Sequence, residues 1–425
     1  MLLVRLVAPD LASEAGGRVI TVTDLFCGAG GSGLGASVVP GVELRIAANH
    51  WPLAIETHAA NFPGVEHDVE VRRYPRTNIL WASPECTAHS QARGVPRAHQ
   101  EPDLFGETLS DEASQRSRAT MWDVPRFAEY HRYDAIIVEN VVDAALWPLY
   151  PAWLHAMRLL GYRHHEVYLN SMHAPSVAAP RAPQSRDRLY VVLWREGNPA
   201  PDLEIRPEAW CAPCDRRVRA VQAWKKTERW GRYRAQYVYR CPRVECRNGI
   251  VEPHVSPASD AIDWSVQGQV IGERNRPLRP ATLARIRAGL ERHAGVPTLV
   301  PAGGTWNSSA SPVTAPFRTR TTRETEGLLV PYYGSSESAV PVSRPVGTLT
   351  TRDRYALVEV IDRSVEQSRF RMLLSPEVQA AMAFRPSYRV LGTRREQIKQ
   401  LGNGVTPPAA EFLIRAVVAS LGVAL

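Results

Sequence analysis

Short apolar runs alternate with amphipathic stretches between residues 19 and 195. Five runs are rich in branched apolar residues and bounded by turn or charged residues, as buried strands are, at 19–26, 43–48, 77–82, 133–139 and 188–194. Helical spacing occurs between them, at 52–62, 124–131 and 147–161. The alternation predicts an α/β fold with a doubly wound, mostly parallel sheet that binds ligands outside the carboxyl ends of its strands.

The pattern changes after about residue 196, where prolines and arginines become more frequent and the apolar runs shorten. Residues 317–331 resemble residues 346–359, which indicates a small, mainly β domain with two similar hairpins. Helical spacing returns at 375–384 and 407–422. We therefore expect four segments: an N-terminal extension (1–18), a catalytic and cofactor-binding segment (19–195), an inserted domain (196–370), and a C-terminal segment that completes the catalytic domain (371–425).

Composition and charge narrow the class of protein. The chain has 425 residues, of which 44% are hydrophobic and 22% charged, as in folded globular proteins. No run reaches the roughly 18 uncharged apolar residues of a membrane helix, so we expect a cytoplasmic protein with no membrane partner. Lysine and arginine number 51 against 43 acidic residues, a formal net charge of +8. Clustered cations bind polyanions, although a basic surface can also serve solubility alone.

A glycine-rich turn follows the first predicted strand. The sequence DLFCGAGGSGLG at 24–35 lets the backbone turn sharply and approach a ligand closely. It lacks the lysine with which phosphate-binding loops reach a phosphate, so a nucleoside without phosphates is the expected ligand. The polar stretch 92–118 is interpreted as an active-site loop, with an inert insertion as the alternative.

Reactive side chains occur where other predicted strands begin or end. Cys86 follows the strand at 77–82 and is a candidate nucleophile, the alternative being a small buried hydrophobic residue. Glu139 ends the strand at 133–139 and could hold or donate a proton. Arg186 and Arg188 stand at alternate positions entering the last strand, which suits an anionic or oxygen-rich ligand.

Four further cysteines form a separate group. Cys211 and Cys214 are a Cys-x2-Cys pair, Cys241 and Cys246 a Cys-x4-Cys pair, and 26 residues separate the two. Two short pairs can complete a tetrahedral thiolate site, so we expect a structural zinc in a subdomain at 205–250; four free cysteines are the alternative. Residues 224–240 interleave cations and aromatics, which suits phosphate contact and base stacking or a solvated hairpin face.

The ordered motifs resemble those of the DNA cytosine-5 methyltransferase family. They are DLFCGAGGSGLG, a strand followed by Pro-x-Cys, Glu-Asn-Val, Gln-x-Arg-x-Arg and Gly-Asn-x-Val-x-Pro, over about 19–195 and 370–422. The resemblance implies a Rossmann-like methyltransferase domain with an inserted, mainly β target-recognition domain. It also implies S-adenosylmethionine as the methyl donor and double-stranded DNA as the partner, with the target cytosine flipped out of the helix.

The resemblance further implies a role for each matching residue. Cys86 would attack C6 of cytosine, Glu139 would hydrogen-bond and protonate the N3/N4 edge, and Arg188 would bind O2 with Arg186 beside it. Asp68 would bind the adenine amino group, and Asn403 would close the pocket. The full implied cofactor set is Phe26, Gly28, Gly30, Gly31, Asn49, His50, Trp51, Asp68, Pro84, Thr120, Met121, Asn403 and Val405.

Three residues depart from the family pattern. Glu85 replaces the proline before the nucleophile, and Thr87 replaces the glutamine after it. His50 stands where the family has a glutamate on the ribose hydroxyls. A histidine pairs only one hydroxyl well, so we expect S-adenosylmethionine to bind weakly and His50→Glu to tighten it; transfer of a different group from a variant of this cofactor is the alternative.

The biological setting implied by the resemblance is a restriction-modification, phage or orphan methyltransferase. A cognate restriction endonuclease is a candidate partner, and we expect a monomer. Two other functions fit the same motifs: an RNA cytosine-5 methyltransferase and a catalytically inactive DNA-binding relative. The long segment 196–370 disfavours the first, and the joint presence of Cys86, Glu139, Arg186 and Arg188 disfavours the second.

Overall fold

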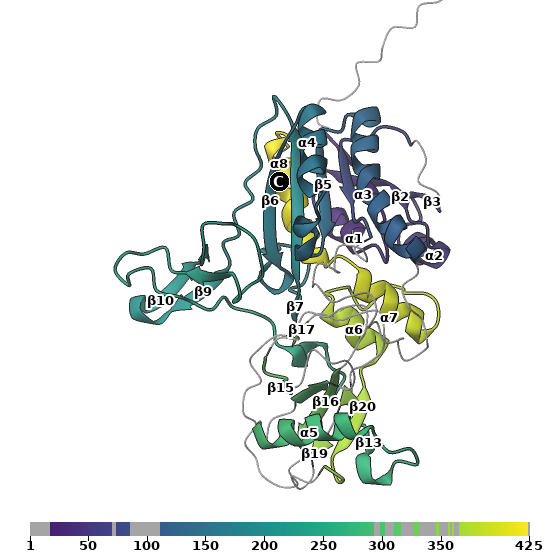
Figure 1. The fold of residues 1–425 in the computed structure, drawn as a ribbon, viewed down its shortest axis with the longest axis vertical. Helices are drawn as coiled ribbons and strands as arrows, with labels where there is room; N and C mark the ends of the chain where they lie inside the picture. The colour runs from purple at the N-terminus through teal and green to yellow at the C-terminus, as the bar shows by residue number, and fades with distance from the viewer. Residues whose placement is uncertain are drawn as a thin grey trace, which may run out of the picture.

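The computed structural model describes residues 18–69, 74–85, 111–292, 298–301, 310–315, 326–331, 346–347, 356–357, 359–360 and 365–423. Figure 1 shows a large central sheet, a smaller lobe beneath it and an arm extending to one side. None of the helices in these ranges has the length and apolar character needed to cross a bilayer.

The central sheet has seven strands in the order β3-β2-β1-β4-β5-β8-β6. Only β8 runs antiparallel to its neighbours, so the sheet is mostly parallel as predicted. The strands are β1 (Ile20–Leu25), β2 (Val42–Ala48), β3 (Glu66–Asp68), β4 (Ile79–Ala82), β5 (Ala135–Asn140), β6 (Tyr162–Asn170) and β8 (Asp187–Arg195).

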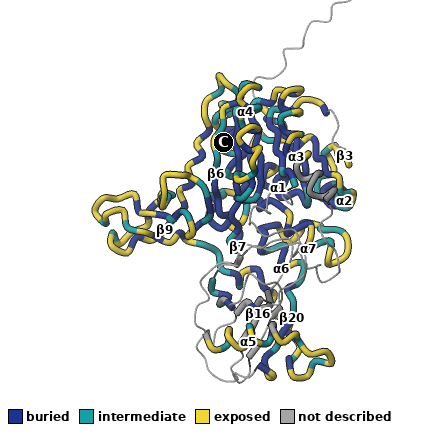
Figure 2. The backbone as a smooth tube through the Cα atoms, in the orientation of Figure 1, coloured by how far each residue is buried: buried dark blue, intermediate teal, exposed yellow. Residues whose placement is uncertain are grey.

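Helices cover both faces of this sheet, with α3 and α4 in front of it in Figure 1 and α8 behind. The C-terminal helix α8 packs against α1, which brings the last segment of the chain back onto the first domain. The helices are α1 (Gly31–Ser37), α2 (Pro52–Ala59), α3 (Asp111–His131), α4 (Tyr150–Leu159) and α8 (Pro407–Ser420), with short 3-10 turns η3 (Val142–Leu146) and η4 (Ser171–His173). Figure 2 shows the strands between these layers as buried.

The lobe is built on a second sheet, in the order β13-β20-β16-β14-β15, with β18 beside β20 and β19 beside β16. Its helix α5 (Pro280–Arg292) packs against β14. The strands are β13 (Gln269–Val270), β14 (Thr298–Pro301), β15 (Ser311–Pro312), β16 (Glu326–Pro331), β18 (Ala356–Leu357), β19 (Glu359–Val360) and β20 (Arg369–Met372). The expected domain boundary at residue 370 falls inside β20, so this lobe extends slightly further than the composition suggested.

Two connections tie the lobe to the central sheet. In the first, β7 (Gln184–Ser185), which precedes β8 of the central sheet, pairs in parallel with β17 (Val346–Gly347), which lies between β16 and β18 along the chain; the two form a separate two-stranded sheet. In the second, helices α6 (Ser375–Ala381) and α7 (Arg394–Asn403) lie between the lobe and the central sheet, and their apolar residues share one buried cluster with Ala29 and Leu34 near the glycine-rich turn.

The arm, residues 205–250, consists of two antiparallel ribbons. One pairs β9 (Glu208–Cys211) with β10 (Arg216–Arg219), and η5 (Ala212–Cys214) joins them; the other pairs β11 (Val221–Trp224) with β12 (Tyr237–Arg240). Tyr237 and Tyr239 are fully buried in the same cluster as the central sheet. The base of the arm is therefore continuous with the catalytic domain and not with the lobe, although the sequence placed both in one segment.

The structure differs from the sequence expectations in the loop at 92–118 and in two elements, and it describes only part of the internal repeat. The predicted loop at 92–118 is partly helical, because α3 begins at Asp111; residues 92–110 lie outside the described residues. Strand β6 and helix α7 had not been predicted. Most of the internal repeat at 317–331 and 346–359 lies outside the described residues, apart from β16 and the short strands β17, β18 and β19.

Candidate functional site

The glycine-rich turn begins where β1 ends, at the carboxyl edge of the sheet. Phe26, Gly28 and Gly30 all have positive φ angles, of 60°, 53° and 85°. A left-handed φ at a phenylalanine is uncommon and is held only where the surroundings require it, often at functional sites. A Cβ atom added to Gly28 would enter open space, so the chain passes here beside a gap that protein atoms do not fill.

Gly30 and Gly31 are constrained by protein contacts. A Cβ at Gly30 would meet the Tyr388 hydroxyl and the His58 ring, and one at Gly31 would collide with the backbone carbonyl of Val405. Tyr388 Oη also donates a hydrogen bond of 2.5 Å to the carbonyl of Ala29. These two glycines therefore let the C-terminal segment pack onto the turn. Both belong to the expected cofactor set, and the sequence did not indicate this packing role.

A buried carboxyl group lies behind the turn. Asp24 accepts a 2.6 Å hydrogen bond from Ser32 Oγ at the start of α1. Burial raises the pKa of Asp24 to about 7, although the bonds from Ser32 and the Gly33 backbone act in the opposite direction. The bond joins the end of β1 to the first turn of α1 and so stabilises the glycine-rich turn that lies between them.

The carboxyl ends of β2 and β3 present four of the expected cofactor residues. The Asn49 backbone N–H donates to the carbonyl of Asp68 at 3.1 Å, and Asn49 Oδ1 accepts from the Trp51 N–H at 2.9 Å. Lys399 Nζ lies 4.7 Å from the centroid of the Trp51 ring, a cation–π contact from α7. The structure thus gathers Asn49, His50, Trp51 and Asp68 at one edge.

Two of the departures from the family pattern, His50 and Glu85, contact each other. His50 follows β2 and Glu85 follows β4, and these strands flank β1 on either side. His50 Nε2 lies 2.9 Å from Glu85 Oε1. The Glu85 carboxylate is therefore directed across the end of β1 toward the histidine, and the two substitutions act as a pair.

This contact changes the expected effect of His50→Glu. The single variant would set two carboxylates against each other, so S-adenosylmethionine should bind less tightly. Because the side chains are 44% and 24% exposed, the change should be modest, about 1 kcal/mol or about five-fold in affinity. Calorimetric titration of the wild type and the variant measures it.

The control is the exchanged pair, His50→Glu with Glu85→His, which should recover most of the lost affinity. Tighter binding by the single variant would instead show that residue 50 contacts the ribose and that a carboxylate serves better there.

The ends of β4 and β5 are joined by Asn140. Its Nδ2 donates to the carbonyl of Pro84 at 3.3 Å and lies 3.7 Å from the sulfur of Met121. The Glu85 backbone N–H donates to Thr120 Oγ1 at 3.2 Å. Pro84, Thr120 and Met121, three residues of the expected cofactor set, thus lie close together. Asn140 was not in that set; its place directly after Glu139 in Glu-Asn-Val was the available signal.

Glu139 and Arg188 form a buried ion pair on neighbouring strands. Arg188 Nε lies 2.9 Å from Glu139 Oε1, and the side chains are only 10% and 8% exposed. Arg188 also donates from Nη1 to the carbonyl of Asp187 at 3.0 Å. Burial of both charges is costly unless they stay paired, so the guanidinium holds the carboxylate in one orientation at the end of β5.

Arg186 points elsewhere. Its Nη2 donates to the carbonyl of Gly402 at 3.0 Å, near the end of α7. The next residue, Asn403, is exposed, and Val405 is buried against the glycine-rich turn. Arg186 therefore holds the end of α7, which carries Asn403, while Arg188 pairs with Glu139. Cys86 and Thr87 lie outside the described residues; the chain is described up to Glu85, the residue before the cysteine.

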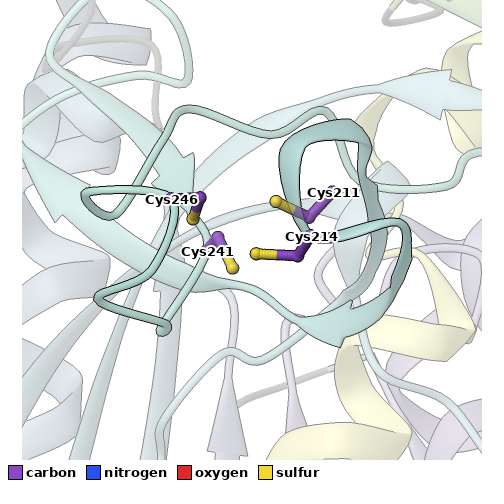
Figure 3. A group of neighbouring side chains, drawn as sticks. All are labelled: Cys211, Cys214, Cys241 and Cys246. Carbon is purple, nitrogen blue, oxygen red and sulfur yellow. The ribbon is translucent and has the colours of Figure 1, made fainter.

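The four cysteines of the arm converge (Figure 3). Cys211 and Cys214 lie on one loop, Cys241 and Cys246 on a facing loop, and all four sulfurs lie within 4.8 Å of one another. None is in a disulfide. A zinc ion with Zn–S bonds of about 2.3 Å sets tetrahedral sulfurs about 3.8 Å apart, so the group fits such an ion with little adjustment.

Comparisons with known proteins indicate the family of the chain. The family described as C-5 cytosine-specific DNA methylase matches residues 20–419. A Dnmt2 mutant of Spodoptera frugiperda is similar in fold, with a TM-score of 0.52, 14% identity and coverage of 94% of this chain and 99% of that one. A protein encoded within an Escherichia coli prophage and described as a DNA modification methyltransferase gives a TM-score of 0.48 and 14% identity. That match covers 95% of this chain and 99% of the other.

Dnmt2 of Schizosaccharomyces pombe gives a TM-score of 0.49 and 13% identity, covering 95% of this chain and 99% of that one. No curated protein sequence matches the chain. The family match spans nearly the whole chain, from β1 to the end of α8, and includes every element that forms the carboxyl edge described above. The chain belongs to the C-5 cytosine-specific DNA methylase family.

Proposed function

We propose that this protein methylates C5 of a cytosine flipped out of double-stranded DNA. The observation that carries the proposal is the buried Glu139–Arg188 pair, 2.9 Å apart, at the same sheet edge as the segment that leads into Cys86. A carboxylate and a guanidinium side by side can address a pyrimidine edge that presents both nitrogen and carbonyl oxygen. Cys86 is the nucleophile in this proposal.

The residues at the carboxyl edge suit S-adenosylmethionine. Gly28 borders open space after β1, and Asn49, Trp51 and Asp68 stand at the ends of β2 and β3, the next strands of the sheet. An aromatic face and a carboxylate are the groups that an adenine ring and its amino group need. The absence of a lysine in the turn agrees with a ligand that has no phosphate. S-adenosylmethionine supplies an electrophilic methyl group when bound.

The residues of the chain have separate tasks in the proposed reaction. The Cys86 sulfur forms a bond to C6, and the electron pair of the C5–C6 double bond moves toward C5 and N3. Glu139 hydrogen-bonds the N3/N4 edge and delivers a proton to N3, which neutralises the charge that develops on the ring; N3 gives that proton back to Glu139 when the ring is restored. Arg188 holds Glu139 and reaches the O2 side. After C5 has gained the methyl group, a water molecule takes the C5 proton, the electron pair of the C5–H bond restores the C5–C6 double bond, and the C6–S bond breaks to release the Cys86 thiolate.

Bisulfite sequencing of plasmid DNA from cells that express the protein tests this function and reveals the target sequence. Protected cytosines at one recurring sequence are expected. Unprotected plasmid DNA together with protected cytosines in RNA from the same cells would replace the proposal with an RNA methyltransferase. Absence of protection in both would indicate an inactive relative.

We further propose that, within the recognition segment expected at 196–370, the lobe on the second sheet, from β13 to β20, reads the DNA sequence. The lobe has its own small apolar core, and β17, between its strands β16 and β18, pairs with β7, which precedes β8 of the central sheet. A separate body beside the catalytic edge can contact bases while the target cytosine occupies the site.

The cysteine group is proposed to bind one structural zinc. Four protein ligands leave no open position, and Cys211 and Cys241 are fully buried, so the ion would hold the loops of the arm together and take no part in the reaction.

Metal analysis of purified protein should find close to one zinc per chain. The variant Cys211→Ser with Cys214→Ser should lose the metal and melt at a lower temperature, because the metal-binding energy contributes to folding. The control Cys27→Ala should retain the zinc, since Cys27 lies in the catalytic domain. Wild-type protein that contains no zinc and is nevertheless fully folded would contradict the proposed zinc site.

A further inference from the structure

The positive charge of this protein is concentrated in the arm. Residues 205–250 contain twelve arginines and lysines and four acidic residues, a net charge of +8. The other 379 residues contain 39 basic and 39 acidic residues, so the arm accounts for the net charge of the whole chain. Four thiolates with one zinc ion would contribute −2, which leaves the arm strongly positive.

The arm is held rigidly at its base. Gln222 Nε2 donates to the carbonyl of Tyr168 on β6 at 3.0 Å. The Trp224 ring packs edge-to-face on the Tyr168 ring, with 5.6 Å between the ring centroids. Arg232 Nη2 lies 2.7 Å from Asp143 Oδ1 in η3. These contacts fix the arm to the central sheet, from which β9 and β10 project sideways into solvent (Figures 1 and 2).

The β9–β10 ribbon has two different faces. Ala209, Cys211 and Val218 are buried in the core of the arm. In the strand register Arg217 is opposite Trp210, and Arg219 is opposite Glu208, so these side chains share the other face. Trp210 is 55% exposed there, although a tryptophan is among the largest apolar side chains.

The arginines on this face have no carboxylate partner. Elsewhere in the arm, Arg206 pairs with Glu204, Arg234 with Glu252 and Arg243 with Glu245. Arg217 and Arg219 are exposed and form no ion pair with any residue that the structure describes. The ribbon therefore presents two guanidiniums, one carboxylate and a tryptophan together on one exposed face, a net positive charge on the part of the arm that projects from the central sheet (Figure 1).

We propose that this face of the β9–β10 ribbon is a second DNA-binding surface. It binds the duplex beside the segment of DNA that the catalytic site and the lobe contact. Arg217 and Arg219 bind phosphates, and Trp210 packs on the sugar or base edge between them. Guanidiniums bind phosphate oxygens in a bidentate manner, and a two-stranded ribbon is of a width that the major groove admits. The inference rests on the proposed action on duplex DNA and extends it by lengthening the footprint.

The test is equilibrium binding of the full-length protein to a 40-base-pair fluorescent duplex across a series of salt concentrations. Each phosphate contact contributes about 0.9 to the slope of log affinity against log salt. The variant Arg217→Gln with Arg219→Gln should therefore lower that slope by about 1.8 and weaken binding at low salt. Trp210→Ala should weaken binding with little change in slope.

The matched control is Arg206→Gln with Arg243→Gln, which removes the same charge from the same arm but from arginines already paired with glutamates. It should change the slope much less. Equal slopes for the two double variants would show only an effect of bulk charge and would overturn the proposal. Unchanged duplex binding by Arg217→Gln with Arg219→Gln would also overturn it, as would a loss confined to a stem-loop RNA probe.

Methylation of plasmid DNA by the same variants separates this inference from the proposed function. If the wild type methylates DNA and the variant Arg217→Gln with Arg219→Gln binds the duplex normally, the second surface is disproved and the proposed function stands. A wild type that modifies only RNA disproves the duplex substrate. Retained zinc and an unchanged melting temperature establish that each variant is folded.

Discussion

Cys86→Ala should abolish methyl transfer while leaving S-adenosylmethionine binding nearly intact. In the proposed reaction the sulfur bonds to the base, and the expected cofactor contacts come from other residues, so calorimetric titration should give similar affinities for the two proteins. Wild-type protein should also form a covalent complex with DNA that contains 5-fluorocytosine, because fluorine cannot leave as a proton. Denaturing electrophoresis detects that complex, which the alanine variant should not form.

Cys27 provides the matched control. It lies in the glycine-rich turn but is only 4% exposed. Burial, reinforced by the charge of Asp24, raises the pKa of Cys27 well above its ordinary value, so this thiol stays protonated and unreactive. Cys27→Ala should therefore keep its activity and its covalent trapping. Normal turnover by Cys86→Ala would remove Cys86 from the mechanism.

Glu139→Gln should lower the single-turnover rate by roughly 10²- to 10⁴-fold, the range associated with loss of a general acid. Glutamine has nearly the same shape and can still accept a hydrogen bond from Arg188, but it cannot deliver a proton to the ring. The loss of charge also leaves Arg188 buried without its carboxylate, which should lower the melting temperature. Rate and melting temperature are therefore measured together, at a temperature where the variant is fully folded.

Glu129→Gln is the control for this change, since Glu129 is an exposed glutamate on α3. Neither its rate nor its melting temperature should differ from the wild type. If Glu139→Gln lowered stability but left the single-turnover rate unchanged, the pair would be a structural element and the acid would have to be sought elsewhere.

Elements made of apolar, branched residues were predictable from the sequence. The runs at 19–26, 43–48 and 133–139 became β1, β2 and β5 with shifts of one or two residues, because strands buried on both faces must be apolar throughout. Strand β6 was missed, since its first half, Tyr162–Glu166, carries arginine and two histidines and is only partly buried. Helix α7 was missed because most of its residues are polar.

The types of many candidate site residues were also apparent from the sequence, since Cys86, Glu139 and Arg188 each lie at the start or end of a recognisable strand. The cysteine spacings indicated a common site, and the four sulfurs do converge. In these cases the residues concerned are near one another along the chain or belong to an ordered set of motifs. Local patterns and motif order are therefore what the sequence by itself determined about this protein.

Partners that lie far apart along the chain were decided only by the tertiary structure. Glu85 contacts His50 because β4 and β2 flank β1, and Arg186 reaches Gly402 because α7 and α8 return to the first domain. Likewise, the strand register alone places Arg217 beside Trp210 on one exposed face. Such contacts depend on strand order and on the path of the chain, which the free energy of the whole core selects, so no local pattern encodes them.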